Sequence, residues 1–273
     1  MNLQLQNKLI VVTASTGGIG FYIAAEAFRN GAFVIVNGRS QESIDKAIQE
    51  IFSENGGTKE SLVGIPADLS SGEGVEAFIK KIKETENKLK TQVYGLVNNL
   101  GFFDPKPFQK TTDEDWEQYH QINLMSGVRL SRHFLPKMLE RDEGRILFVS
   151  SESGLKPLPH MLAYSVSKTA QISLARGMAE ITKGTNVTVN SILPGPTKTE
   201  SVAQFMKGMA DQKNQTFEEY EKSFFKETEP TSLLQRLLDP KEVANVTVFT
   251  LSPLASGVNG AAQHVNGGIV RHI

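Results

Sequence analysis

The sequence predicts an α/β fold: a single domain built on a doubly wound parallel sheet, with helices on both faces. Short runs rich in β-branched residues alternate with longer segments of helical periodicity, which is typical of stacked βαβ units. Several of the short runs are almost wholly apolar, as strands buried on both faces of a parallel sheet must be. A chain of 273 residues is long for one domain but can still fold around one core.

Seven apolar runs are the expected strands, and local signals between them mark the ends of helices. The expected strands are Leu9–Thr13, Ala32–Asn37, Leu62–Ala67, Val93–Asn98, Arg145–Ser151, Val187–Leu193 and Ala262–Val265. Asn30-Gly31 predicts a helix end before the second strand. Capping boxes that open helices are expected at Thr111–Glu114, Thr216–Glu219 and Asp239–Glu242.

The composition excludes several classes of function. The formal net charge is −1 and the basic residues are dispersed, so the chain has no electrostatic footprint for nucleic acid. It contains no cysteine, which rules out disulfides and a thiolate nucleophile, and its five histidines lack metal-ligand spacing, so no metal is expected. Residues 1–8 have neither a cationic head leading into an apolar core nor a small-residue cleavage site, so we expect no targeting segment, and no apolar run approaches membrane-spanning length. We therefore expect a cytoplasmic protein that binds a small molecule.

The segment from Thr197 to Glu229 interrupts the alternation of strands and helices. It is too long for an ordinary connection and carries helical patterns of its own. Long excursions from an α/β core are more often functional than structural. We expect a substrate lid over residues 197–229, with a structural insertion as the alternative.

The first expected strand runs directly into a stretch of small residues, TASTGGIG, at positions 13–20. A helical pattern follows, so this stretch places a helix N-terminus at the edge of the sheet, where free N–H groups and the helix dipole attract phosphate. Small residues also let a pyrophosphate approach the backbone. The spacing does not fit GxGxxG, because Ile23 stands where the third glycine belongs, so a tight strand-to-helix turn is the alternative explanation.

The end of the second expected strand indicates which dinucleotide would bind. An NAD site uses an acidic residue here to bind the ribose hydroxyls. The sequence instead reads Val36-Asn-Gly-Arg39-Ser40, with no carboxylate and with a guanidinium suited to a 2′-phosphate. We therefore expect NADP(H), with NAD(H) as the alternative, since an arginine after a strand is also a common surface residue.

Tyr164 and Lys168 are four residues apart, which places a phenol and an ammonium on one face of a helix. A phenol ordinarily ionises near pH 10, too high for ready proton exchange at neutrality. A cation about 4 to 5 Å away favours the phenolate by roughly 3 to 4 kcal/mol at an effective dielectric of about 20. We therefore expect Lys168 to lower the pKa of Tyr164 and to make it a general acid or base.

Together these motifs resemble the short-chain dehydrogenase/reductase family of the TGxxxGxG and YxxxK type, and in particular its ketoreductases of the 3-oxoacyl-ACP reductase kind. Ser151 lies thirteen residues before Tyr164, and Asn123 stands within Gln-Ile-Asn-Leu. The resemblance implies that Ser151 donates a hydrogen bond to a substrate carbonyl oxygen and that Tyr164 protonates this oxygen. It implies that Lys168 also holds the nicotinamide ribose and that Asn123 supports a water chain that resupplies the tyrosine. Ser150 is the rival serine, but strand alternation turns it to the opposite face.

Further matches run along nearly the whole chain. Thr13, Gly18 and Gly20 match TGxxxGxG, while Ala14 replaces the first glycine. The other matching segments are Ala67-Asp68-Leu69, Asn98-Asn99-Leu100-Gly101, Pro194-Gly195-Pro196-Thr197-Lys198-Thr199 and Val265-Asn266-Gly267-Gly268. The predicted cofactor contacts are Thr13, Ser15, Thr16, Gly18, Ile19, Gly20, Arg39, Ser40, Asp68, Leu69, Asn99, Gly101, Tyr164, Lys168, Pro194, Gly195, Thr197 and Thr199.

The sequence therefore predicts an NADP(H)-dependent reductase of ketones, or the reverse alcohol dehydrogenase. The expected substrate-binding residues are mostly apolar: Phe102, Phe103, Glu152, Leu158, His160, Met161, Val202, Phe205, Met206 and Met209. The resemblance implies a dimer or tetramer that uses the helices around Trp116–Met138 and Tyr164–Ile181. Two alternatives stay open, an NAD-dependent polyol or sugar dehydrogenase and a regulator that binds nucleotide without turnover.

Overall fold

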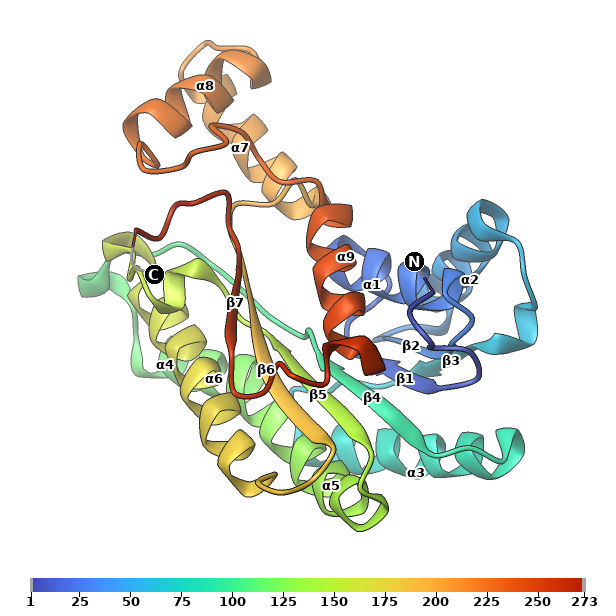
Figure 1. Ribbon diagram of the computed structural model, residues 1–273. Helices are drawn as coiled ribbons and strands as arrows, with labels where there is room; N and C mark the ends of the chain where they lie inside the picture. The colour runs from blue at the N-terminus through green and yellow to red at the C-terminus, as the bar shows by residue number, and fades with distance from the viewer. Residues whose placement is uncertain (1, 272–273) are drawn as a thin grey trace.

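Seven parallel strands form one sheet through the centre of the protein, in the order β3-β2-β1-β4-β5-β6-β7 (Figure 1). The structure is a computed structural model and describes residues 2–271. The strands are β1 Leu9–Val12, β2 Phe33–Gly38, β3 Leu62–Pro66, β4 Val93–Asn98, β5 Gly144–Val149, β6 Val187–Pro194 and β7 Ala262–Val265. Every expected strand is confirmed to within two residues at each end, and the doubly wound α/β fold is confirmed with it.

The order of the strands reverses beside β1. The chain builds outward from β1 through β2 to β3 and then returns to add β4 on the other side of β1. The loops that follow β1 and β4 therefore diverge in opposite directions at the carboxyl edge of the sheet. In a doubly wound sheet this divergence opens the crevice in which ligands bind.

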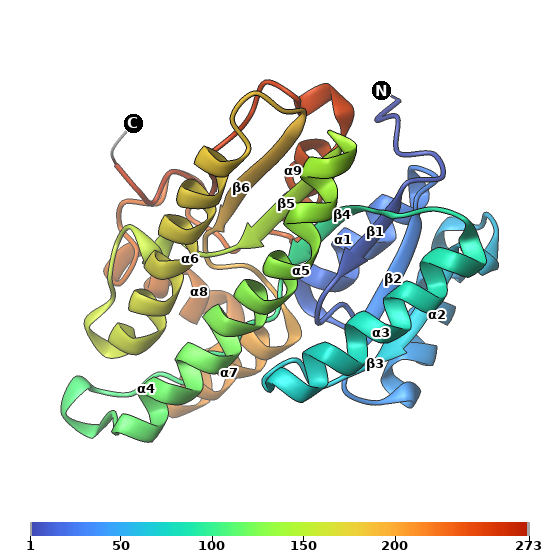
Figure 2. The same ribbon diagram turned by 90° about the horizontal axis from the view of Figure 1, so that it is seen from below.

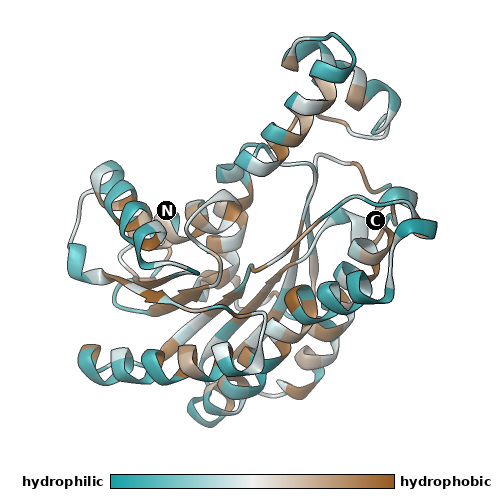
Figure 3. Ribbon diagram, turned by 180° about the vertical axis from the view of Figure 1, so that it is seen from behind, coloured by the Kyte–Doolittle hydropathy of each residue, from teal (hydrophilic) through white to brown (hydrophobic). Residues whose placement is uncertain are grey.

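Helices cover both faces of the sheet. The helices are α1 Gly18–Arg29, α2 Gln41–Asn55, α3 Gly72–Leu89, α4 Asp113–Tyr119, α5 Ser126–Arg141, α6 Leu162–Ile181, α7 Glu200–Gln212, α8 Phe217–Glu227 and α9 Pro240–Leu251. One core lies under α1, α2 and α9, and a second lies under α3, α5 and α6 (Figures 1 and 2). Figure 3 shows hydrophobic residues concentrated along the strands, while the outer turns of the helices are mostly hydrophilic.

Most of the expected helix ends are confirmed. Helix α1 is capped at Asn30, and Gly31 takes a φ of 84°, a left-handed conformation that favours glycine. The capping boxes at Thr216 and Asp239 form as expected. The box expected at Thr111 is wrong by one residue: Thr112 caps α4, and Asp115 rather than Glu114 returns the bond to the backbone.

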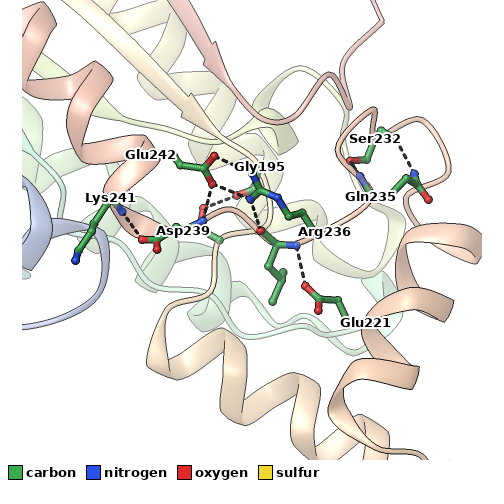
Figure 4. A network of polar contacts seen from close by, with 10 residues as sticks. Gly195, Glu221, Ser232, Gln235, Arg236, Asp239, Lys241 and Glu242 are labelled. Carbon is green, nitrogen blue, oxygen red and sulfur yellow. Dashed lines mark hydrogen bonds and ion pairs between the residues drawn. The ribbon is translucent and has the colours of Figure 1, made fainter.

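Helices α7 and α8 form an arm that stands away from the rest of the protein (Figure 1). The arm packs around a small core of its own, which includes Met206, Tyr220 and Phe225. Where the chain returns, Arg236 donates to both carboxylate oxygens of Glu242 at 2.8 and 2.9 Å (Figure 4). The arm thus interrupts the α/β alternation at the segment where the sequence predicts a lid.

Within residues 2–271, no helix combines the length and the apolar character needed to cross a membrane.

Candidate active site

A cavity of about 530 Å³ opens at the carboxyl ends of β1, β4, β5 and β6. One side is lined by the loops that follow these strands and by α6. The other side is lined by residues of the arm and of the segment just after it: Glu200, Ser201, Val202, Phe205, Met206, Phe224, Thr228 and Glu229. The cavity therefore lies at the point where the strand order reverses and where the arm approaches the sheet.

The small residues after β1 form the floor of this cavity. Ala14 has a φ of 49°, so an alanine adopts the left-handed conformation at the family's first glycine position, at a cost of roughly 1 to 2 kcal/mol. The side-chain amide oxygen of Asn37 accepts a hydrogen bond from the Ala14 N–H at 3.0 Å and helps to hold this loop. Gly20 has no room for a side chain, because a Cβ would lie 2.4 Å from the Asn99 amide and 2.5 Å from the Ala14 carbonyl oxygen.

Helix α1 presents an uncapped N-terminus to the cavity. Its N-cap residue is Gly17, so no side chain accepts a hydrogen bond from the first turn, and nothing lies within 4 Å of the Cβ position of Gly17. Gly17, Gly18 and Ile19 all line the cavity. Free N–H groups and the positive end of the helix dipole there fit a dinucleotide pyrophosphate.

Two predicted cofactor residues near this loop have structural roles. The Thr13 hydroxyl accepts hydrogen bonds from the N–H groups of Asn99 and Leu100, both at 2.9 Å, and so joins the loops after β1 and β4. Ser15 is fully buried, donates to the Val12 carbonyl at 2.7 Å and accepts from the Asn37 N–H at 3.0 Å. The hydrogen bonds of Thr13 and Ser15 hold the loop after β1 in place. Contact of these two residues with a cofactor stays a prediction.

The predicted adenosine-side residues lie beyond the lining of the cavity. Arg39 and Asp68 are exposed and close enough to interact, and a backbone hydrogen bond from Ser70 lowers the pKa of Asp68, with Arg39 adding to this shift. Ser40 caps α2, and Leu69 is a buried core residue. Thr16 lies against Gly38, one residue before Arg39, because a Cβ at Gly38 would lie 2.6 Å from the Thr16 methyl group. Arg39 therefore lies exposed beside Asp68, one residue beyond the contact between Gly38 and Thr16.

The segment after β6 contributes the opposite side of the predicted cofactor site. Pro194, Gly195, Thr197 and Thr199 all line the cavity, together with Asn99 and Gly101 after β4. A Cβ at Gly18 would lie 3.5 Å from the Thr199 methyl group, within van der Waals contact, so the loops after β1 and β6 come close together at the cavity. The sequence thus places ten of its predicted cofactor residues on this lining: Gly18, Ile19, Asn99, Gly101, Tyr164, Lys168, Pro194, Gly195, Thr197 and Thr199.

Ser151, the predicted reactive serine, follows β5 and lines the cavity. Its hydroxyl donates to a carboxylate oxygen of Glu152 at 2.7 Å and accepts from the Ser153 N–H at 3.1 Å. Ser150 also lines the cavity, but its hydroxyl donates to the Lys168 carbonyl at 2.8 Å. The expectation that Ser150 turns away from the site is wrong, since both serines line the cavity, and the choice of Ser151 stays a prediction.

Tyr164 lies in the first turn of α6, among aromatic rings. Phe103 and Tyr119 each contact its ring edge to face, with centroids 6.4 Å apart. Burial raises the pKa of Tyr164, and the Glu152 carboxylate raises it further, while the Ser151 hydroxyl opposes the shift. The phenol is thus held in its protonated form at neutral pH.

Lys168 lies one turn further along α6, with its ammonium 5.6 Å from the centroid of the Tyr164 ring. It donates to the Val149 carbonyl at 2.9 Å and to the Gln171 side chain at 3.2 Å. Burial lowers the pKa of Lys168 to about 7, opposed by Glu152. The expectation that Lys168 lowers the pKa of Tyr164 is wrong for this arrangement, because burial weakens the charge on the lysine and favours the neutral phenol.

Asn123 lies in a π-helical segment, His120–Met125, between α4 and α5. Its side chain accepts from the Phe102 N–H at 2.8 Å and donates to the Ser167 hydroxyl at 2.9 Å. Its backbone carbonyl accepts a hydrogen bond from Gln171, which in turn accepts one from Lys168. The Gln171 side chain therefore links Lys168 to Asn123. The family resemblance implies a water chain supported by Asn123, and the sequence analysis missed Gln171. Its role is visible only from its buried hydrogen bonds to Lys168 and to the Asn123 carbonyl.

The remaining cavity lining contains most of the expected substrate residues. They are Phe102, Phe103, Glu152, Leu158, His160, Met161, Val202, Phe205 and Met206, whereas Met209 instead packs in the core of the arm. Glu229 also lines the cavity and pairs with Lys156, and the sequence analysis missed it because 77 positions separate it from Glu152. Among residues 2–271, no group of three or more histidine or acidic side chains is arranged to hold a metal ion.

Comparisons with known proteins agree with this geometry. The family model described as short chain dehydrogenase matches residues 8–210. The uncharacterized oxidoreductase YvrD of Bacillus subtilis is 53% identical over 273 residues, with both chains covered completely. The 3-oxoacyl-[acyl-carrier-protein] reductase FabG of Aquifex aeolicus is 32% identical over 269 residues, covering 98% of this chain and 100% of FabG. The crystal structure of L-sorbose reductase from Gluconobacter frateurii, complexed with NADPH and L-sorbose, covers 100% of both chains with a TM-score of 0.91 and 27% identity. The chain therefore belongs to the short-chain dehydrogenase family of oxidoreductases.

Proposed function

We propose that this protein is an NADP(H)-dependent oxidoreductase that interconverts a ketone and a secondary alcohol. One observation carries the proposal: Ser151, Tyr164 and Lys168 line the same cavity as the uncapped N-terminus of α1. A dinucleotide held at that helix end would extend toward the tyrosine along a lining that includes Asn99 and Gly101. A regulator without turnover would need no proton donor beside its nucleotide, so the presence of Ser151, Tyr164 and Lys168 together argues against that alternative.

The residues of the chain would divide the proton chemistry between them. The bound nicotinamide supplies the hydride in reduction and accepts it in oxidation. Tyr164 holds its proton at neutral pH and gives it to the substrate oxygen as negative charge develops there. Ser151 orients that oxygen. Lys168, whose pKa is about 7, exchanges protons readily at neutrality and can restore the proton of the tyrosine.

A preference for NADP(H) over NAD(H) is supported by the end of β2. Asn37 stands where an NAD site would use a carboxylate, and its amide is occupied with the Ala14 N–H and the Ile65 carbonyl. Arg39 follows on the exposed side of the same strand end. A guanidinium there would pair with a 2′-phosphate, which only NADP(H) carries.

Turnover assays with a panel of ketones and alcohols, each run with both cofactors, would test the function. We expect NADPH oxidation with at least one carbonyl class, and Arg39→Ala should raise the KM for NADPH about tenfold or more while leaving the KM for NADH nearly unchanged. An unchanged KM for NADPH in Arg39→Ala would remove the basis for the cofactor assignment. Tight binding of NADPH without turnover of any substrate would favour the regulator.

We also propose that the arm acts as a lid and that the protein is a dimer or tetramer. The arm lines the cavity yet keeps a separate small core, which suits movement as a unit. Val166 and Ile181 on α6 are 53% and 60% exposed, which suits burial against another copy of the chain. Hydrogen exchange of the arm with and without substrate, and light scattering of the protein in solution, would test these two points.

A further inference from the structure

A buried carboxyl group stands beside the proposed reactive serine. Glu152 directly follows Ser151, is only 6% exposed and lines the cavity. One of its oxygens accepts from the Ser151 hydroxyl at 2.7 Å and the other accepts from the Ser153 hydroxyl at 3.3 Å. The backbone of Glu152 itself adds a further hydrogen bond to this carboxylate. Since a carboxylate offers about four acceptor positions, these bonds do not fill all of them.

The charges around Glu152 leave it without a cationic partner of its own. Among the residues that the structure describes, no lysine, arginine or histidine forms an ion pair with it. The ammonium of Lys156 is instead paired with Glu229, whose carboxylate also faces Glu152. From α6, Tyr164 and Lys168 face Glu152, and the lysine is held by Val149 and Gln171. Burial raises the pKa of Glu152 and the Glu229 carboxylate raises it further, while the hydrogen bond from Ser151 opposes the shift.

The hydrogen bond from Ser151 to Glu152 uses the hydroxyl proton that Ser151 would need to donate to a substrate carbonyl. A serine hydroxyl has one proton, and the Ser151 proton points to Glu152 while the Ser153 N–H occupies one of the serine lone pairs. A plain ketone has no group to offer Glu152 in exchange. For such a substrate, turning the serine proton toward the carbonyl oxygen leaves a buried carboxylate short of a donor, which is costly.

A substrate with a hydroxyl group on the carbon next to its carbonyl removes this conflict. Its two oxygens lie on adjacent carbons and so are about one hydrogen-bond length apart, close to the 2.7 Å between the Ser151 hydroxyl and the Glu152 carboxylate. The substrate hydroxyl can donate to Glu152 while Ser151 donates to the substrate carbonyl. All four oxygens are then satisfied.

We propose that Glu152 is a specificity-determining residue that selects carbonyl substrates carrying a hydrogen-bond donor, a hydroxyl or an ammonium group, on the carbon next to the carbonyl. The inference rests on the proposed function of the cavity and narrows its substrate class. The apolar part of the lining, which includes Phe103 and Phe205, then contacts the remainder of the substrate.

Hydroxyacetone and butanone form the matched pair of substrates for the test, since they differ only by a hydroxyl in place of a methyl group. We expect the wild type to reduce hydroxyacetone with a kcat/KM about tenfold to a hundredfold higher than butanone, the range that one hydrogen bond to a charged group supports. Glu152→Leu should lower kcat/KM for hydroxyacetone and raise it for butanone, because Ser151 is released. Glu152→Gln keeps a polar side chain of the same shape and serves as the test if the leucine variant fails to fold. Its ratio of kcat/KM for hydroxyacetone to that for butanone should lie between those of the wild type and Glu152→Leu.

Glu229→Gln is the control variant, since it removes a neighbouring carboxylate without touching the Ser151 hydrogen bond. It should change kcat/KM for both substrates by a similar factor and so preserve their ratio. Equal rates for hydroxyacetone and butanone in the wild type, or loss of the ratio in Glu229→Gln but not in the Glu152 variants, would overturn the inference. Failure of the wild type to reduce any carbonyl compound would instead contradict the proposed function itself.

Discussion

The two sides of the cavity are built in different ways. On the sheet side, Ser151, Lys168 and Gln171 are at most 6% exposed and are held by hydrogen bonds to their neighbours. On the arm side, α7 and α8 pack mainly on each other, and Phe205 is 43% exposed. From this contrast we expect the sheet side to set the chemistry and the arm side to set substrate affinity. Changes on the first side should act on kcat, and changes on the second should act on KM.

The largest expected effect is on the sheet side, from Tyr164→Phe. The variant loses the proton donor, so kcat should fall by about a hundredfold to ten thousandfold, while NADPH still binds. Steady-state rates and NADPH fluorescence titration would measure the two effects separately. Tyr220→Phe removes the same hydroxyl from α8 and serves as the control, which should retain most of the wild-type kcat.

The buried charge of Lys168 should appear in the pH dependence of stability. Its pKa is about 7 in the folded protein and near 10.5 when unfolded, so the cost of burying the ammonium is present in full below about pH 7 and is relieved as the pH rises from 7 toward 10.5. Between pH 7 and 9.5 the free energy of unfolding of the wild type should therefore rise relative to Lys168→Met, by up to about 1.4 kcal/mol per pH unit. Urea titrations at several pH values would measure the difference, and parallel curves would show that the lysine is not buried as described.

Gln171→Met tests the link between Lys168 and Asn123. The variant keeps the size of the side chain but removes both hydrogen bonds. We expect kcat to fall about tenfold with little change in KM, and the pH profile of kcat to move to lower pH because the ammonium loses an acceptor. A purely structural role for Gln171 would instead lower stability without moving the pH profile.

The smallest expected effect belongs to the arm side, from Phe225→Ala. Phe225 is 1% exposed in the core of the arm, so truncation should loosen the arm while leaving the sheet intact. The substrate KM should rise about fivefold with kcat nearly unchanged, and amide exchange should quicken in α7 and α8. Phe249→Ala, on the surface of α9 at 38% exposure, is the matched control. A large fall in kcat with an unchanged KM in Phe225→Ala would contradict the expectation that the arm side acts on substrate affinity.

The sequence predicts those parts of the cavity that depend on local patterns, for physical reasons. Strands buried on both faces must be apolar, so β1 and β4 can be located from composition alone. The loop at Ala14 and the pair of Tyr164 and Lys168 depend on spacings of a few residues, which the sequence shows directly. Even the capping box of α4 was wrong by only one position.

What the sequence could not show depends on contacts between distant segments and on burial. Glu229 pairs with Lys156 and faces Glu152 only because the chain returns from α8 to the cavity. The pKa of Tyr164 was expected to fall, on the distance and charge of Lys168 alone. In the structure, burial lowers the pKa of the lysine and raises that of the phenol, and neither effect is visible in a spacing of four residues.

Transfer of a label from cofactor to product tests the central claim most directly. NADPH carrying deuterium on the reactive face of its nicotinamide would be incubated with the protein and a carbonyl substrate that it reduces, and the product alcohol would be analysed by mass spectrometry. One deuterium on the former carbonyl carbon of each product molecule is the result we predict. Product without the label, with the deuterium retained on the cofactor or lost to water, would contradict the assignment of the cavity as a site of hydride transfer.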